Sequence, residues 1–215
     1  MATLLLLLLC AALGLADGLR TTTAMAGRLR ATPRSSAVVL DGSGSTIGLA
    51  DASKQALVAA CQSAPPNGVG ASEEEVAAVE AAIQALEPFC AEQPAQAPLT
   101  GAYDLLFSTA KGGSNGKVGP FVGKVTQTFV DELNFINAVE LFGGAVKISL
   151  FAEREVLDDT RIRVTFRETA AQAFGKELFR KSITGSGVWK QRFVDDDLRV
   201  MMTPSIFILR KQVAS

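Results

Sequence analysis

The sequence of 215 residues contains no histidine. Histidine is the commonest general base of enzymes and the commonest transition-metal ligand in proteins. An enzyme built from this chain would have to use other groups, chiefly carboxylates. We therefore predict that the protein is not an enzyme and that it holds no metal ion.

Cysteine is also scarce. The chain has three cysteines, of which Cys10 lies near the N-terminus, while Cys61 and Cys90 lie outside any CxxC spacing. They are too few for a disulfide-stapled fold or for a zinc site. We interpret Cys61 and Cys90 as small packing residues, and the sequence leaves open one bridge between them.

The chain lacks an excess of positive charge. Its formal net charge is −1, and residues 41–215 alone carry 17 basic and 21 acidic groups without a basic cluster. Clustered lysine and arginine supply most of the affinity of proteins for nucleic-acid phosphates. Nucleic acid is therefore not an expected partner.

The N-terminal segment contains an apolar run, residues 4–15, that is shorter than the roughly twenty residues needed to span a bilayer. Its length is typical of a signal-peptide core, although no positive charge precedes it. We predict a signal peptide over residues 1–17.

Acidic residues are absent from residues 18–40, which contain four arginines and many hydroxyl side chains. This composition is typical of a transit peptide, and a Gly/Ser-rich linker follows over residues 41–48. A signal peptide followed by a transit peptide indicates import into a plastid (chloroplast) through a bipartite leader, as in algae with secondary plastids. The alternative is a secreted protein with a polar linker.

Two amphipathic helices are predicted within residues 51–88. Apolar residues recur at helical spacing over residues 51–61, and Ser72 with Glu75 forms a capping-box pattern at the start of the second helix. The glutamates at 73–75 fit the positive end of a helix dipole better than a metal site.

Alternation of apolar and polar residues dominates the remainder of the chain, residues 99–211. Strands with one dry and one wet face fit an antiparallel sheet, and short turns favour an up-and-down barrel. The predicted fold class is mainly β, a lipocalin-like antiparallel up-and-down β-barrel preceded by two short α-helices. About eight strands are expected, at residues 101–109, 119–129, 134–142, 145–153, 160–168, 175–183, 187–194 and 197–209, the last of which could break at Pro204.

A barrel of about eight strands is wide enough either to be filled by side chains or to hold one small apolar ligand. Large apolar side chains are the candidates for its interior, and packing is their first explanation. The alternation does not reveal which face points inward. The candidate ligand-binding residues are Phe166, Trp189, Phe107 and Phe121, with Phe166 and Trp189 placed first.

Several segments match, in order, the sequence pattern of one known family. Residues 99–109 read LTGAYDLLFST, where that pattern is L-x-G-x-W-x-L-L-Y-T, and Asn67-Gly68 with Ala71-Ser72 is similar to its N-R-G-x-x-A-S segment. The order continues through residues 135–141 (FINAVEL), 161–166 (RIRVTF), 187–189 (GVW), 197–200 (DLRV) and 206–210 (IFILR). In these segments the chain resembles the plastid lipid-associated protein (PAP)/fibrillin family.

The resemblance implies a PAP/fibrillin domain over residues 49–212 that binds or scaffolds an apolar lipid, carotenoid or prenylquinone. It also implies peripheral association with lipid bodies (plastoglobules) or the thylakoid membrane, with no cofactor. By analogy with lipocalins, Tyr103 would close one end of the barrel under a cation–π contact from Arg199 or Arg210. Residues 201–205 (MMTPS) replace the arginine and glycine-rich turn of many members, so a role of that arginine does not transfer.

Two other motifs have simpler explanations. The acidic run at residues 195–197 lacks the glycine turn of a calcium loop and is interpreted as an exposed bend. The glycines and lysine of residues 112–117 lack P-loop spacing and are interpreted as a hairpin loop. Two alternatives stay open: an enzyme or accessory factor acting on an apolar substrate, which needs a buried carboxylate, and a secreted lipocalin.

Overall fold

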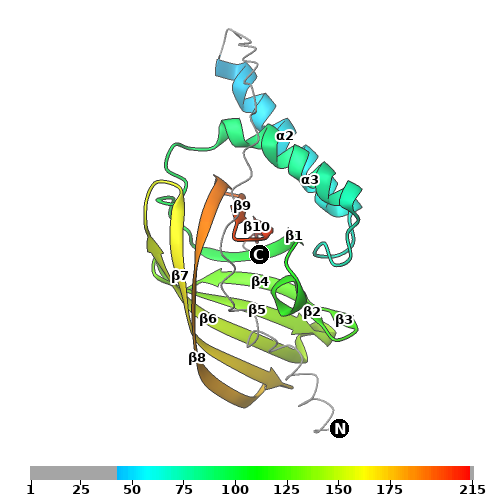
Figure 1. The fold of residues 1–215 in the computed structure, drawn as a ribbon, viewed down its shortest axis with the longest axis vertical. Coiled ribbons are helices and arrows are strands. Elements are labelled where there is room, and N and C mark those ends of the chain that lie inside the picture. Colours follow the sequence, from blue (N-terminus) through cyan, green and yellow to red (C-terminus); the bar gives the residue numbers. More distant parts are fainter. Residues whose placement is uncertain (1–42, 214–215) are drawn as a thin grey trace, which may run out of the picture.

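The structure, a computed structural model, describes residues 43–213, so the predicted signal peptide (residues 1–17) and the predicted transit peptide (residues 18–40) lie outside it. In this part the fold is mainly β, with two helices followed by an eight-stranded antiparallel sheet (Figure 1). The helices are α2 Ser43–Ser63 and α3 Glu73–Leu86, and the strands of the sheet are β1 Gly101–Ser108, β4 Lys124–Phe129, β5 Asn134–Leu141, β6 Val146–Val156, β7 Arg161–Ala173, β8 Lys176–Val194, β9 Leu198–Met202 and β10 Ile206–Lys211.

The hydrogen-bonded order of the sheet closes on itself. From β4 to β10 each strand pairs with the next in sequence, and β1 pairs with both β4 and β10. A separate hairpin is formed by β2 Lys117–Val118 and β3 Phe121–Val122. Each strand of the closed sheet therefore has one face that points inward and one that points outward.

The predicted number of strands is confirmed, but two boundaries differ. The strands expected at residues 175–183 and 187–194 form one continuous strand, β8, in which Gly185 pairs with Phe166 and Gly187 with Val164. Neither glycine has a positive φ, so both fit an extended strand. The last predicted strand is instead two strands, β9 and β10, which turn around Pro204.

The two predicted helices are present, and α3 has the predicted capping box. Ser72 Oγ accepts from the Glu75 amide at 3.2 Å, and Glu75 Oε2 accepts from the Ser72 amide at 2.7 Å. Helix α2 begins at Ser43, so residues 43–48 are helical and not the expected linker. Within residues 43–213, no helix is both long enough and apolar enough to cross a membrane.

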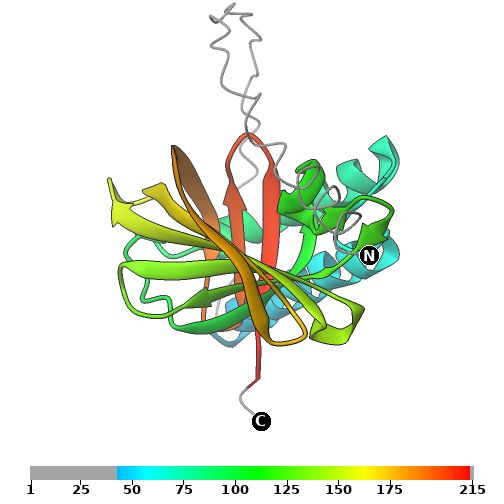
Figure 2. The same cartoon turned by 90° about the horizontal axis from the view of Figure 1, so that it is seen from below.

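Two apolar clusters lie on opposite faces of the closed sheet. The first lies on the inward face and contains side chains from β1 and β4 to β10, including Tyr103, Phe129 and Phe135. The second joins α2 and α3 to the outward face of β9 and β10 through residues such as Leu57, Ile83 and Val200. Figures 1 and 2 accordingly show both helices against the β9–β10 side, while the β7–β8 hairpin extends to the far end.

The Asn67-Gly68 turn anchors the loop between the helices to the sheet. Asn67 Nδ2 donates to the carbonyls of Asn115 and Gly123, and the Ser108 amide donates to the Asn67 carbonyl. Gly68 has a φ of +74°, and a Cβ there would lie 2.6 Å from the Ser108 carbonyl oxygen. The Asn67-Gly68 motif, which is part of the family resemblance, is therefore explained by its structural role in this turn.

Candidate ligand-binding site

A continuous run of aromatic rings crosses the inward face. Tyr103 and Phe129 meet edge to face at 5.8 Å between centroids, and Phe129 and Phe135 lie 5.4 Å apart. Trp189 lies 5.9 Å from Phe135 and 6.4 Å from Phe166. The run starts among fully buried residues and ends at Phe166 and Trp189, which are half-buried.

The end of this run is accessible because β8 has a free edge. Strand β9 pairs with β8 only from Lys190 to Val194, so the earlier part of β8 pairs with β7 alone among the described strands. A Cβ added at Gly185 would lie 3.7 Å from the Phe166 ring, and one at Gly187 would lie 3.6 Å from Trp189 Nε1. Both aromatic rings thus lie next to strand backbone that carries no side chain.

The other end of the run contains a buried polar cluster centred on Arg199. Arg199 is fully buried and donates from Nε to Gln191 Oε1 at 2.8 Å and from Nη1 to Gln127 Oε1 at 2.5 Å. Gln127 Nε2 in turn donates to Asn137 Oδ1 at 2.8 Å. The guanidinium also lies over the Phe129 ring, 5.2 Å from its centroid.

A second buried arginine reaches the same ring. Arg154 is 7% exposed, its guanidinium lies 5.7 Å from the centroid of the Phe129 ring, and its Nε donates to the Glu132 carbonyl at 2.6 Å. Three buried N–H donors of this cluster have no partner among the described residues: Arg199 Nη2, Arg154 Nη1 and Gln191 Nε2. The cluster therefore has donors in excess of acceptors.

The electrostatics of the cluster follow from burial. Loss of hydration, with repulsion from Arg154, lowers the pKa of the Arg199 guanidinium to about 9. Burial likewise lowers the pKa of Arg154 and raises that of the Tyr103 phenol. The guanidinium of arginine is protonated in proteins at neutral pH. Neither Arg154 nor Arg199 forms a salt bridge with a described carboxylate.

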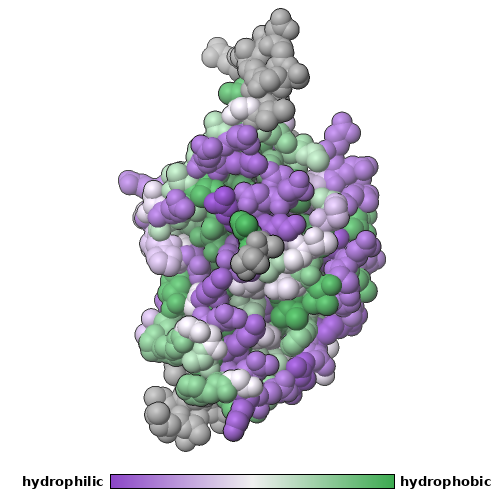
Figure 3. Space-filling model, turned by 180° about the vertical axis from the view of Figure 1, so that it is seen from behind, coloured by the Kyte–Doolittle hydropathy of each residue, from purple (hydrophilic) through white to green (hydrophobic). Residues whose placement is uncertain are grey.

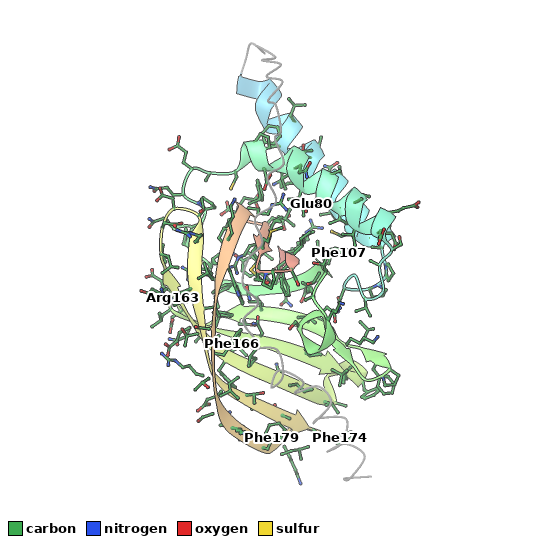
Figure 4. The ribbon with its side chains drawn as sticks, viewed as in Figure 1. Glu80, Phe107, Arg163, Phe166, Phe174 and Phe179 are labelled. Carbon is green, nitrogen blue, oxygen red and sulfur yellow. The ribbon has the colours of Figure 1, made fainter. Side chains whose placement is uncertain are left out.

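The four aromatic residues predicted to bind a ligand divide into two pairs. The structure brings Phe166 and Trp189 together on the inward face. Phe107 instead lies in the cluster beneath α2 and α3, because β1 has a register shift between Leu105 and Phe107 (Figure 4). Phe121 is exposed in the separate β2–β3 hairpin. The expectation that these last two line the interior is wrong.

The cation–π contact that was predicted to close the barrel, between Tyr103 and Arg199 or Arg210, is formed by other pairs of residues. Arg199 packs over Phe129, which contacts Tyr103, while the amine of Lys211 lies 5.9 Å from the centroid of the Tyr103 ring. Arg210 is on the outward face, where its Nε lies 3.3 Å from Asp197 Oδ1. Tyr103 and Arg199 thus share an end of the interior, and Arg210 is not part of it.

Sequence reasoning missed Gln127, Arg154 and Gln191. A signal for Gln127 was present, because it alternates in step with Val125 and Phe129 and so lies on the dry face of its strand. A polar residue at such a position needs a buried partner.

No carboxylate is buried in the part of the chain that the structure describes. The same residues contain no group of three Cys, Asp or Glu side chains arranged to hold a metal ion. In the acidic run, Asp195 Oδ1 accepts from the amides of Asp197 and Leu198, and Asp195 Oδ2 pairs with Lys54 at 2.9 Å. These contacts stabilise a turn, so the acidic run has a structural role. Cys61 and Cys90 are both free thiols.

A hollow of about 550 Å³ lies on the outward face of β4, β5 and β6. Its lining includes Thr126, Thr128 and Ser149 and the ion pair of Lys147 with Glu140, which are 3.0 Å apart. The hollow lacks the aromatic run of the inward face. On the face seen in Figure 3, hydrophobic side chains form patches between charged ones. Because the aromatic run lies on the inward face and not in this hollow, the inward face is the better candidate for an apolar ligand.

Comparison with known proteins gives one family. The PAP_fibrillin family model matches residues 51–202, which include most of α2, all of α3 and most of the sheet. No curated protein and no solved structure matches the chain.

Proposed function

Because the chain belongs to the PAP/fibrillin family of plastid lipid-associated proteins, we propose that it binds or scaffolds apolar molecules without being an enzyme. The ligands would be carotenoids, prenylquinones or acyl lipids, held within the closed sheet as in a lipocalin-like barrel. The observation that carries this proposal is the aromatic run from Tyr103 to Phe166, which begins in the core and ends at half-buried rings beside a free strand edge.

The proposal includes peripheral association with a lipid surface through an exposed group of residues that we call the apolar tip: Phe121, Val122, Phe142 and Phe174. Phe142 and Phe174 are 61% and 83% exposed, and the rings of Phe121 and Phe142 lie 4.9 Å apart. The Phe174 amide donates to the Ala145 carbonyl, which joins the β7–β8 turn to the β5–β6 turn.

Lysines flank the apolar tip. Lys117 pairs with Val122 in the small hairpin, and Lys176 follows the β7–β8 turn. Both are exposed. Exposed aromatic residues beside basic ones favour an interface with anionic lipid headgroups. Figure 4 shows Phe174 at the end of the molecule opposite the helices, so this contact would leave α2 and α3 away from the lipid.

A plastid location is supported by the family, which is associated with plastids. The proposed route is the bipartite leader, and its test is imaging of a fluorescent protein fused to residues 1–48. Plastid fluorescence is the expected result, whereas fluorescence confined to the secretory pathway would favour the secreted alternative. Fractionation of plastids would then separate plastoglobule from thylakoid association.

The direct test of ligand binding is extraction of the full-length protein from its native source, followed by mass spectrometry of lipids and pigments. We expect an apolar molecule to co-purify with the protein. The Phe166→Ala variant should retain about a tenth of that molecule, because removing the phenyl group that the ligand would cover costs on the order of 1–2 kcal/mol of contact. Phe151→Ala, whose ring lies on the outward face beside the Arg180 guanidinium, is the matched control outside both the interior and the apolar tip. If nothing apolar co-purifies, the carrier role is rejected.

A further inference from the structure

The buried polar cluster of Arg154, Gln191 and Arg199 is not explained by packing alone. Each of these side chains keeps one buried N–H without a partner. An unpaired buried donor destabilises a fold because it loses its hydrogen bonds to water, and an unpaired buried charge destabilises it more. A site that retains three such donors and two such charges is suited to an outside group that supplies acceptors and negative charge.

The three donors belong to one place in the fold. Arg199 and Gln191 are hydrogen-bonded to each other, and the guanidinium groups of Arg199 and Arg154 lie over the same ring, Phe129. Repulsion from Arg154 contributes to the lowered pKa of Arg199, which also indicates that the two are close. The Tyr103 ring, which contacts Phe129 edge to face, borders the same cluster.

The surroundings of the cluster define the rest of the ligand. From Phe129 the aromatic run passes through Phe135 to Trp189 and Phe166, at centroid separations of 5.4, 5.9 and 6.4 Å. An elongated apolar chain that lies along these rings would place one end at the guanidinium groups and the other at the half-buried end of the run.

We infer that the interior binds a long-chain carboxylic acid, with its carboxylate held by Arg154, Arg199 and Gln191 and its acyl chain along Phe135, Trp189 and Phe166. This inference rests on the proposed function, since it selects one ligand class within it. A carboxylate offers acceptors only and a negative charge, which matches unpaired donors on cations. A carotene hydrocarbon has no acceptor, and a quinone oxygen carries no charge.

The test uses the single tryptophan of the chain, Trp189, as the reporter. Full-length protein freed of lipid is titrated with dibromostearic acid, whose bromine atoms quench tryptophan fluorescence, and in parallel with its methyl ester. The two probes share the same chain and differ in the carboxylate. The acid should bind at least about tenfold more tightly than the ester, because charge-assisted hydrogen bonds are the stronger ones.

Variants locate the carboxylate. Arg154→Gln should weaken binding of the acid about tenfold and leave binding of the ester unchanged, and Arg199→Gln should do the same where circular dichroism shows that it folds. Arg210→Gln, on the outward face, is the matched control and should change neither. Equal binding of acid and ester by the unaltered protein overturns the inference but leaves the proposed function standing. Failure of both probes to bind rejects both.

Discussion

Arg192 of β8 and Glu80 of α3 form an ion pair of 2.8 Å although 112 positions separate them in the chain. The same guanidinium donates to Glu87 at 2.5 Å, and the side chain of Arg192 is only 8% exposed. One cation from the sheet is thus held between two carboxylates at the C-terminal half of the helical segment. This contact fixes α3 across the outward face of the sheet.

The first prediction concerns this contact. Arg192→Met should lower the free energy of unfolding by about 2 kcal/mol, because it leaves Glu80 and Glu87 without their partner at a partly desolvated site. Urea unfolding followed by circular dichroism measures the change. Arg163→Met, which breaks an exposed pair with Glu155 on the outward face, should cost less than about 1 kcal/mol. Equal losses of unfolding free energy in both variants would show that the contact between Arg192 and α3 stabilises the fold no more than an exposed ion pair does.

The second prediction concerns Gly68. A Cβ at this position would meet the Ser108 carbonyl oxygen at 2.6 Å and the Phe107 ring at 2.9 Å, in addition to the strain of a positive φ. Gly70 has a similar φ of +80° with nothing within 4 Å of the added Cβ, so it isolates the strain from the clash. Gly70→Ala should cost about 1 kcal/mol and Gly68→Ala clearly more. Thermal unfolding of both variants tests this, and equal melting temperatures would contradict it.

The third prediction concerns the apolar tip. Phe174→Ser should reduce binding of the protein to anionic phospholipid vesicles roughly tenfold, because the lost phenyl group is worth about 2 kcal/mol when buried in lipid. Vesicle flotation measures the bound fraction. Val130→Ser, at an exposed position in the β4–β5 turn, is the control and should bind as the unaltered protein does. If both variants lose binding equally, the tip is not the contact.

The fourth prediction concerns the pH dependence of stability at Asp158. Hydrogen bonds from the Thr160 amide and from Arg161 lower the pKa of this carboxyl to about 2. Because the folded-state pKa lies below the ordinary value of 3.8, the carboxylate stabilises the fold above about pH 4, and this contribution is lost as the pH falls toward 2. Asp158→Asn should therefore lower the melting temperature at pH 7 and converge with the unaltered protein near pH 2. A difference that is constant across this range would contradict the assignment.

Local signals were sufficient for much of the fold. The capping box of Ser72 and Glu75 and the alternation along β6 and β7 each depend on neighbours within a few residues, so sequence spacing predicts them. The order of motifs likewise identified the family that the family model later matched.

Other features depend on partners that are distant in sequence. Gly185 and Gly187 resemble a turn, yet pairing with β7 keeps them extended. Leu105 and Phe107 are two positions apart and would lie on the same face of a regular strand. A register shift in β1 instead places Phe107 in the cluster beneath α2 and α3. The position of Gln127 on a dry face could be predicted, but the approach of Arg154 to Arg199 could not, because these two meet only when strands far apart in the chain close over Phe129.

The pairing of β1 with β10 has a kinetic consequence. Asp104 receives a hydrogen bond from Gln212, 108 positions later, and Tyr103 pairs with Lys211. Contacts of such long range carry a large loop-closure cost and slow the folding of β proteins. Strands β4 to β9 can form hairpins one after another, but the ring closes only when the C-terminal strand arrives. We therefore expect the arginine cluster and the aromatic run to face water until that step, so that the interior proposed to bind a ligand is completed last.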